Sequence, residues 1–202
     1  IVMVVTVVVS FLGGMAFRKK FKGSAIIFYL VITSLIIPSI LISLGVGILF
    51  NVLDWDVHWS TSALGSQLTW TIPFGLLIMF AVFNRFDGRY EEAARDLGAS
   101  NWQVVRYVVL PIIAPSLIGV GLFGFTLSYD EFSRTLLTAG TYNTLPLEIF
   151  GMTTSVTTPV LYALGTLTTL FSFFIIVSFM GLFLWIKRKQ KRVPAIDDLE
   201  KV

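Results

Sequence analysis

Residues 87–106 read DGRYEEAARDLGASNWQVVR and form a polar segment between two long runs without a charged residue or histidine, 59–84 and 107–129. Each run exceeds the roughly 20 predominantly apolar residues that a helix needs to cross the hydrocarbon core of a bilayer. The order apolar, polar, apolar therefore predicts two membrane-spanning helices joined by a loop outside the bilayer.

The rest of the chain repeats this pattern. Runs 24–50 and 149–186 also lack Asp, Glu, Lys, Arg and His, and 1–17 is apolar but slightly short for a span. Only 13% of the residues are charged and 55% are hydrophobic, whereas charged residues approach a quarter of a soluble domain. We predict an all-α fold, a polytopic membrane helix bundle with five spans in this sequence, forming a single transmembrane domain over residues 1–202.

The basic residues indicate how the bundle is oriented. Of the 15 Lys and Arg residues, 14 fall in loops 18–23 and 85–106 and in the basic tail 187–202, and only Arg134 lies in an intervening loop. Cytoplasmic loops carry such an excess, so these three segments are predicted to be cytoplasmic, and 51–60 and 130–158 external. The positive charges lie at helix ends, where membrane lipid is a nearer partner than nucleic acid, which we do not expect the chain to bind.

The polar loop 85–106 has the composition of two short helices. Residues 90–97 are good helix formers, Gly98 suits the left-handed turn that ends a helix, and Ser100 or Asn101 can cap the next one. Composition alone also fits an ordinary amphipathic connector on the membrane surface.

The spacing in this loop is more specific than its composition. Glu92-Ala93-Ala94, three residues, Gly98, nine residues, Val108, one residue and Leu110-Pro111 follow in order. This spacing resembles the EAA loop of ABC importer permeases of the binding-protein-dependent family. The resemblance implies that the loop forms a coupling helix in a groove of a cytoplasmic ATPase, and that the coupling residues are Glu92, Ala93, Ala94, Gly98, Leu110 and Pro111.

The same resemblance implies the rest of the assembly. We expect a bacterial inner-membrane subunit that works with an ABC ATPase dimer, a second permease subunit, homologous or identical, and a periplasmic solute-binding protein. Such permeases commonly have six helices with both termini inside, so a further helix is expected before residue 1. The sequence has no phosphate-binding loop, no cysteine and a single histidine, so we expect no enzymatic activity, no cofactor and no metal site in this chain.

Residues 128–132, SYDEF, and 144–146, TLP, resemble the corresponding stretch of spermidine/putrescine-type permeases. Tyr129, Asp130 and Glu131 are therefore candidates for a substrate path, because a cationic polyamine would compensate carboxylates at the end of an apolar helix. Both carboxylates could instead lie in the external aqueous layer or pair with Arg134. Permeases for iron, opines and aminophosphonates carry a similar stretch, and a membrane enzyme or a channel remains the alternative outside this family.

Overall fold

The computed structural model describes residues 1–19, 21–155 and 159–191, and these residues form helices and loops with no strand. The elements, including the single π-helical turns η1 and η2, are α1 (Val2–Phe17), α2 (Ser24–Ile36), α3 (Ser39–Val52), η1 (Trp59–Ala63), α4 (Leu64–Asn84), α5 (Arg89–Asp96), α6 (Asn101–Val104), η2 (Val105–Val109), α7 (Leu110–Tyr129), α8 (Leu145–Ser155) and α9 (Pro159–Lys191). The all-α prediction is confirmed.

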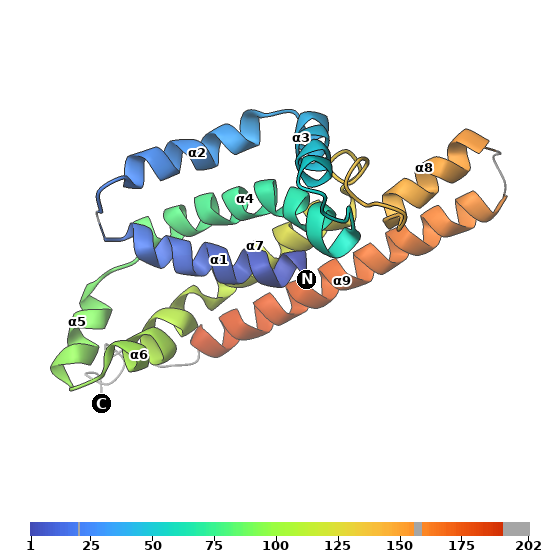
Figure 1. Cartoon of the computed structure of the whole chain (residues 1–202). Helices are drawn as coiled ribbons and strands as arrows, with labels where there is room; N and C mark the ends of the chain where they lie inside the picture. Colours follow the sequence, from blue (N-terminus) through green and yellow to red (C-terminus); the bar gives the residue numbers. More distant parts are fainter. Residues whose placement is uncertain (20, 156–158, 192–202) are drawn as a thin grey trace.

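Helices α1, α4 and α7 pack against one another and form the centre of the bundle, which Figure 1 shows from the side. The buried core consists of Met79, Phe83, Val104, Val109, Ile113 and Val120. Helix α1 approaches α4 closely at Gly14, where an added Cβ would lie 2.9 Å from Met79 and from the Phe83 ring. The first 17 residues are therefore an integral part of the core.

Three helical stretches are long and apolar enough to cross a membrane: Trp59–Asn84, Asn101–Tyr129 and Pro159–Arg188. Helix α1 is apolar but has only 16 residues. The run 24–50, expected as one span, forms α2 and α3, which are bent by 107° and could count together as a fourth span. The bend follows from Pro38, since the residue before a proline is driven out of the helical region, and Ile37 is extended with φ −66° and ψ 128°.

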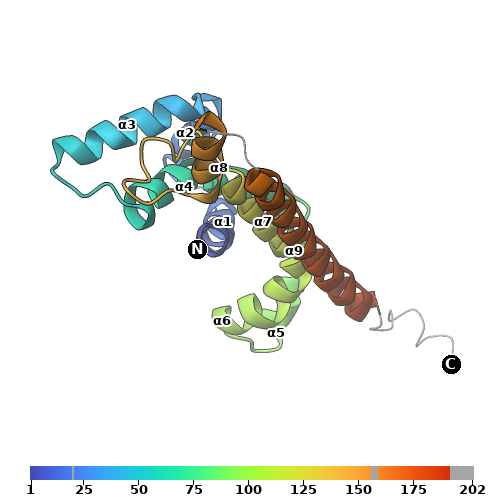
Figure 2. The same cartoon turned by 90° about the vertical axis from the view of Figure 1, so that its right-hand side faces the viewer.

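The run 149–186 also divides, into the end of α8 and the long helix α9. Figures 1 and 2 show α5, α6 and the last turns of α9 at one end of the bundle, and α3, α8 and the loop 130–144 toward the other. The C-terminal ends of α1 and α9 both lie toward the α5 end (Figure 1), and the sequence there carries Arg18 after α1 and Lys187 and Arg188 in the last turns of α9. Lys20, residues 156–158 of the predicted external segment and 192–202 of the predicted tail fall outside the described residues.

Candidate functional site

Helix α5 ends in a turn that requires a left-handed residue. Gly98 has φ +83°. This left-handed conformation is unfavourable for residues that carry a Cβ atom, whereas glycine adopts it readily. The Gly98 N–H donates to the Arg95 carbonyl at 2.8 Å, and the Ala99 N–H donates to the Ala94 carbonyl at 3.0 Å. These two bonds form a Schellman motif, which satisfies carbonyls that the end of a helix leaves without partners.

Helix α6 begins at Asn101, directly after Ser100, which forms a complete capping box. The Ser100 Oγ accepts from the Gln103 N–H at 3.4 Å, and the Gln103 Oε1 accepts from the Ser100 N–H at 2.7 Å. From Asn101 the chain continues as one helix to Tyr129, passing through the π-helical turn η2. That wider turn ends two residues before Pro111, which lacks an N–H donor, as expected where a proline interrupts the regular hydrogen-bond ladder.

The structure places the candidate coupling residues in two groups. Glu92, Ala93 and Gly98 are exposed on the loop, whereas Ala94 is half-buried and packs against the core. Leu110 is half-buried and Pro111 exposed in the first turn of α7. Two large apolar side chains of the loop also face solvent, Leu97 at 90% and Trp102 at 66% exposure. The α5 end of the bundle therefore presents a surface that mixes charged side chains of both signs with exposed apolar ones.

Glu91 was not singled out from the sequence, yet it is the buried carboxylate of this region. It forms an ion pair with Arg18 at the end of α1, and its Oε2 lies 3.4 Å from Nη2 of Arg95. Glu91 is 8% exposed. Nothing in the local sequence distinguishes it from Glu92, because its partner lies 73 positions away.

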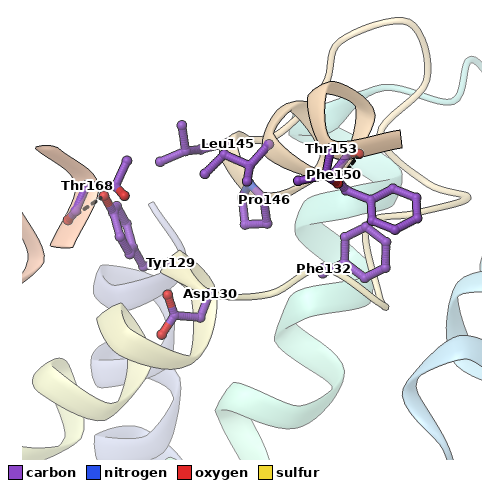
Figure 3. A pocket seen from close by; sticks show the side chains of 9 residues that line it. Tyr129, Asp130, Phe132, Leu145, Pro146, Phe150, Thr153 and Thr168 are labelled. Carbon is purple, nitrogen blue, oxygen red and sulfur yellow. Dashed lines mark hydrogen bonds between the residues drawn. The ribbon is translucent and has the colours of Figure 1, made fainter. Parts of the chain in front are cut away.

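At the opposite end of the bundle, an open pocket of about 420 Å³ lies between the ends of α7, α8 and α9 (Figure 3). Its lining residues are Tyr129, Asp130, Phe132, Leu145, Pro146, Ile149, Phe150, Thr153 and Thr168. The Tyr129 hydroxyl donates to the Thr168 carbonyl at 3.2 Å, and this bond connects α7 to α9. The Phe132 and Phe150 rings pack with centroids 4.9 Å apart. Asp130 is the one carboxylate among these nine residues, and it is exposed.

Glu131 lies in a different environment from its neighbour. It is 6% exposed and is not among the residues that line the pocket. Its Oε1 accepts a hydrogen bond from the backbone N–H of Arg134 at 2.8 Å. Burial raises the pKa of the Glu131 carboxyl, and the hydrogen bond from Arg134 and the positive charge of Arg134 act in the opposite direction. The structure thus gives Glu131 a role in shaping the loop after α7.

Arg134 is also buried, at 1% exposure, and it anchors this loop to α4. Its Nη1 donates to the Thr69 hydroxyl at 2.6 Å, and its Cζ lies 5.2 Å from the Trp70 ring centroid. The Ser66 hydroxyl donates to the Arg134 carbonyl at 2.8 Å. Ser43 of α3 accepts from the Leu137 N–H at 3.0 Å, so the loop is held from two helices. No local sequence pattern predicts these contacts.

The Ser128 hydroxyl connects α7 to α4 beside the pocket, because it donates to Oε1 of the buried Gln67 at 2.6 Å. A second cavity, of about 340 Å³, lies there and shares Tyr129, Leu145 and Pro146 with the first. Polar groups of α4 and α7 therefore meet next to the two cavities.

Comparison with known proteins agrees with this arrangement. Residues 6–192 match the family model described as binding-protein-dependent transport system inner membrane component. The spermidine/putrescine transport system permease protein PotC of Haemophilus influenzae is 30% identical over 163 residues, which are 80% of this chain and 63% of that protein. The Escherichia coli PotC is 29% identical over 80% of this chain and 61% of its own length. The putrescine transport system permease protein PotI of Escherichia coli is 26% identical over 88% of this chain and 64% of its own length.

The chain thus spans somewhat less than two thirds of these curated relatives. Among solved structures, an inward-facing conformation of the MetNI methionine ABC transporter matches with a TM-score of 0.68, covering 92% of this chain and 91% of that chain at 15% identity. At that identity the likeness concerns the fold alone. Since the family model covers nearly the whole sequence, the chain belongs to the family of binding-protein-dependent transport system inner membrane components.

Proposed function

We propose that the chain is the permease subunit of an ABC importer in a bacterial inner membrane, and that a separate cytoplasmic ATPase dimer hydrolyses the ATP. The observation that carries this proposal is the loop 85–106. It combines the EAA spacing with a left-handed turn at Gly98 and an exposed surface at the end of the bundle where basic residues gather. In this proposal the α5 end and the tail 187–202 face the cytoplasm.

The ATPase docks on the exposed side of α5 and its turn. Glu92 offers a carboxylate for an arginine or a backbone N–H of the partner, and Ala93 allows close approach because its side chain is small. Gly98 permits the turn that sets the direction of α5 relative to α6. Ala94, Leu110 and Pro111 support the loop from the bundle side, where Ala94 packs against the core. A second permease subunit and a periplasmic solute-binding protein complete the importer.

We further propose that the solute is a polyamine of the spermidine and putrescine class. Relatives named for those solutes support this class. The pocket supports it chemically, because the Asp130 carboxylate can neutralise an ammonium group and the Tyr129 and Phe132 rings can contact a cation through their faces. Glu131, turned into the loop, acts on this site through the backbone it holds.

The proposal is tested by reconstitution. The chain is purified with an ATPase, a second permease and a solute-binding protein from the same organism, and uptake of labelled putrescine and spermidine into proteoliposomes is measured with and without internal ATP. ATP-dependent uptake of either polyamine supports the whole proposal. Uptake of another solute with the same assembly would retain the importer and reject the polyamine. Purification without any associated ATPase would reject the importer.

A further inference from the structure

We propose that Arg18 and Glu91 form a positioning pair that fixes helix α5 against the membrane bundle, so that movement of the docked ATPase is transmitted to α1 and α4. This inference rests on the proposed function, because it concerns how the loop 85–106 passes on movement. It assigns to Glu91 a role different from that of its neighbour Glu92.

The ion pair joins two elements that are distant in the sequence. Arg18 follows the last residue of α1, and Glu91 lies in the first turn of α5. One carboxylate oxygen of Glu91 pairs with Nη1 of Arg18, and the other lies 3.4 Å from Nη2 of Arg95. Both oxygens therefore have a cationic partner, one from outside α5 and one from within it.

Shelter from solvent makes this pair different from an ordinary surface ion pair. The side chains of Arg18 and Glu91 are 23% and 10% exposed. The nearby pair of Arg89 and Asp87 has a longer N–O distance, 3.6 Å, and side chains 88% and 49% exposed. Exposed pairs contribute little, whereas removing one partner of a sheltered pair leaves a charge without compensation. The Arg18–Glu91 contact is therefore the ion pair that can hold α5 in place.

Arg18 is in turn fixed by α4 and the segment that directly follows it. Its Cζ lies 5.2 Å from the Phe83 ring centroid and 5.0 Å from that of Phe86. Phe83 belongs to the buried core and also contacts α1 at Gly14, one turn before Arg18. A force applied to Glu91 thus reaches the close contact between α1 and α4 at Gly14.

The burial of Glu91 separates positioning from docking. Glu91 is 8% exposed and has its partners within the chain, whereas Glu92 and Ala93 face solvent. A partner protein reaches Glu92 without rearrangement of the loop. Without the ion pair, α5 would be held by the half-buried Ala94 and Ala99 and by the non-helical segments on either side of it, 85–88 and 97–100. Rotation of α5 with the ATPase would then leave α1 in place.

The test compares Arg18→Gln and Glu91→Gln in proteoliposomes that contain the complete importer. Co-purification of the ATPase, basal ATP hydrolysis, stimulation of hydrolysis by the solute-loaded binding protein, and uptake are measured for each. We expect the ATPase to remain bound and basal hydrolysis to persist, while stimulation and uptake fall at least roughly fivefold, the lower range of measured coupling between sites. Arg18→Lys keeps the charge and should retain stimulation. Lys19→Gln, which removes an exposed charge beside Arg18, is the matched control.

The double variant Arg18→Gln with Glu91→Gln adds a thermodynamic criterion. It leaves neither charge unpaired across α1 and α5, so its loss should be no greater than that of either single variant. If a single variant fails to insert, Arg18→Lys is compared with the double variant, because neither leaves an isolated charge. Arg18→Lys keeps the ion pair and should retain stimulation, whereas the double variant lacks the pair.

Three results would overturn the inference. Normal stimulation and uptake in Glu91→Gln, with the ATPase bound, would reject the positioning pair and leave the proposed function intact. Release of the ATPase by Glu91→Gln to the extent caused by Glu92→Ala would place Glu91 in the docking surface. Failure of the unmodified chain to bind any ATPase would reject the proposed function, and this inference with it.

Discussion

Replacement of Gly98 by valine tests the coupling loop most directly. Gly98 has φ +83°, and an added Cβ would have no heavy atom within 4 Å. The cost of a side chain therefore comes from the backbone alone and amounts to about 1–2 kcal/mol for a residue in the left-handed region. Relief of that strain would break the bonds from the Gly98 and Ala99 N–H groups and change the angle between α5 and α6.

Strain of this size translates into a measurable loss of binding. If α5 leaves its docking geometry to relieve 1–2 kcal/mol, the affinity for the ATPase falls by roughly 5- to 30-fold, at 1.4 kcal/mol for each tenfold change. The assay is binding of the purified ATPase to the permease in lipid nanodiscs. Gly98→Asn is the matched control, since asparagine tolerates the left-handed region and should lose much less. Equal affinities of Gly98→Val and the unmodified chain would refute the role of the turn.

Three further predictions concern other parts of the chain. Glu92→Ala should weaken ATPase binding by about 1.5–3 kcal/mol, the range for a hydrogen bond to a charged group, with normal membrane insertion; an unchanged dissociation constant in the nanodisc assay would count against it. Asp130→Asn should lower polyamine uptake in proteoliposomes more than it lowers ATPase binding. Glu131→Gln should instead lower the thermal unfolding midpoint, because it weakens the bond to the Arg134 N–H. The same changes in uptake and unfolding midpoint for both variants would contradict the different roles assigned to these carboxylates. Asp56→Cys, in a chain with no cysteine of its own, should react with an impermeant thiol reagent from outside the inner membrane; reaction only after permeabilisation would reverse the orientation.

The local features of the coupling loop could be predicted because their causes are close in the sequence. Gly98 in a left-handed turn and Ser100 as a cap depend on residues within about one helical turn, and the structure confirms both. The apolar runs likewise indicate an all-α membrane protein. Pro38 is visible in the sequence, but the angle of 107° between α2 and α3 depends on how α3 packs against the loop after α7, where Ser43 binds Leu137.

Contacts between distant segments could not be predicted in this way. The pairing of Arg18 with Glu91 depends on how α1 and α4 pack, and neither residue differs in charge from its exposed neighbour, Lys19 or Glu92. The different environments of Asp130 and Glu131 have the same origin, because the fold of the loop after α7 decides which carboxylate is buried. A single sequence gives residue type and order, and these contacts depend on tertiary packing.

The helical stretch from Asn101 to Tyr129, which includes the π-helical turn η2, has a mechanical consequence. Its 29 residues extend over about 43 Å at 1.5 Å per residue. A tilt of about 5° around its midpoint would displace each end by about 2 Å in opposite directions, treating that helix as a rigid rod of this length. One end of this helix carries the capping box beside Gly98, and the other end carries Tyr129 at the pocket. A small rotation imposed on the loop 85–106 would therefore change the width of the pocket without any change in the helix itself.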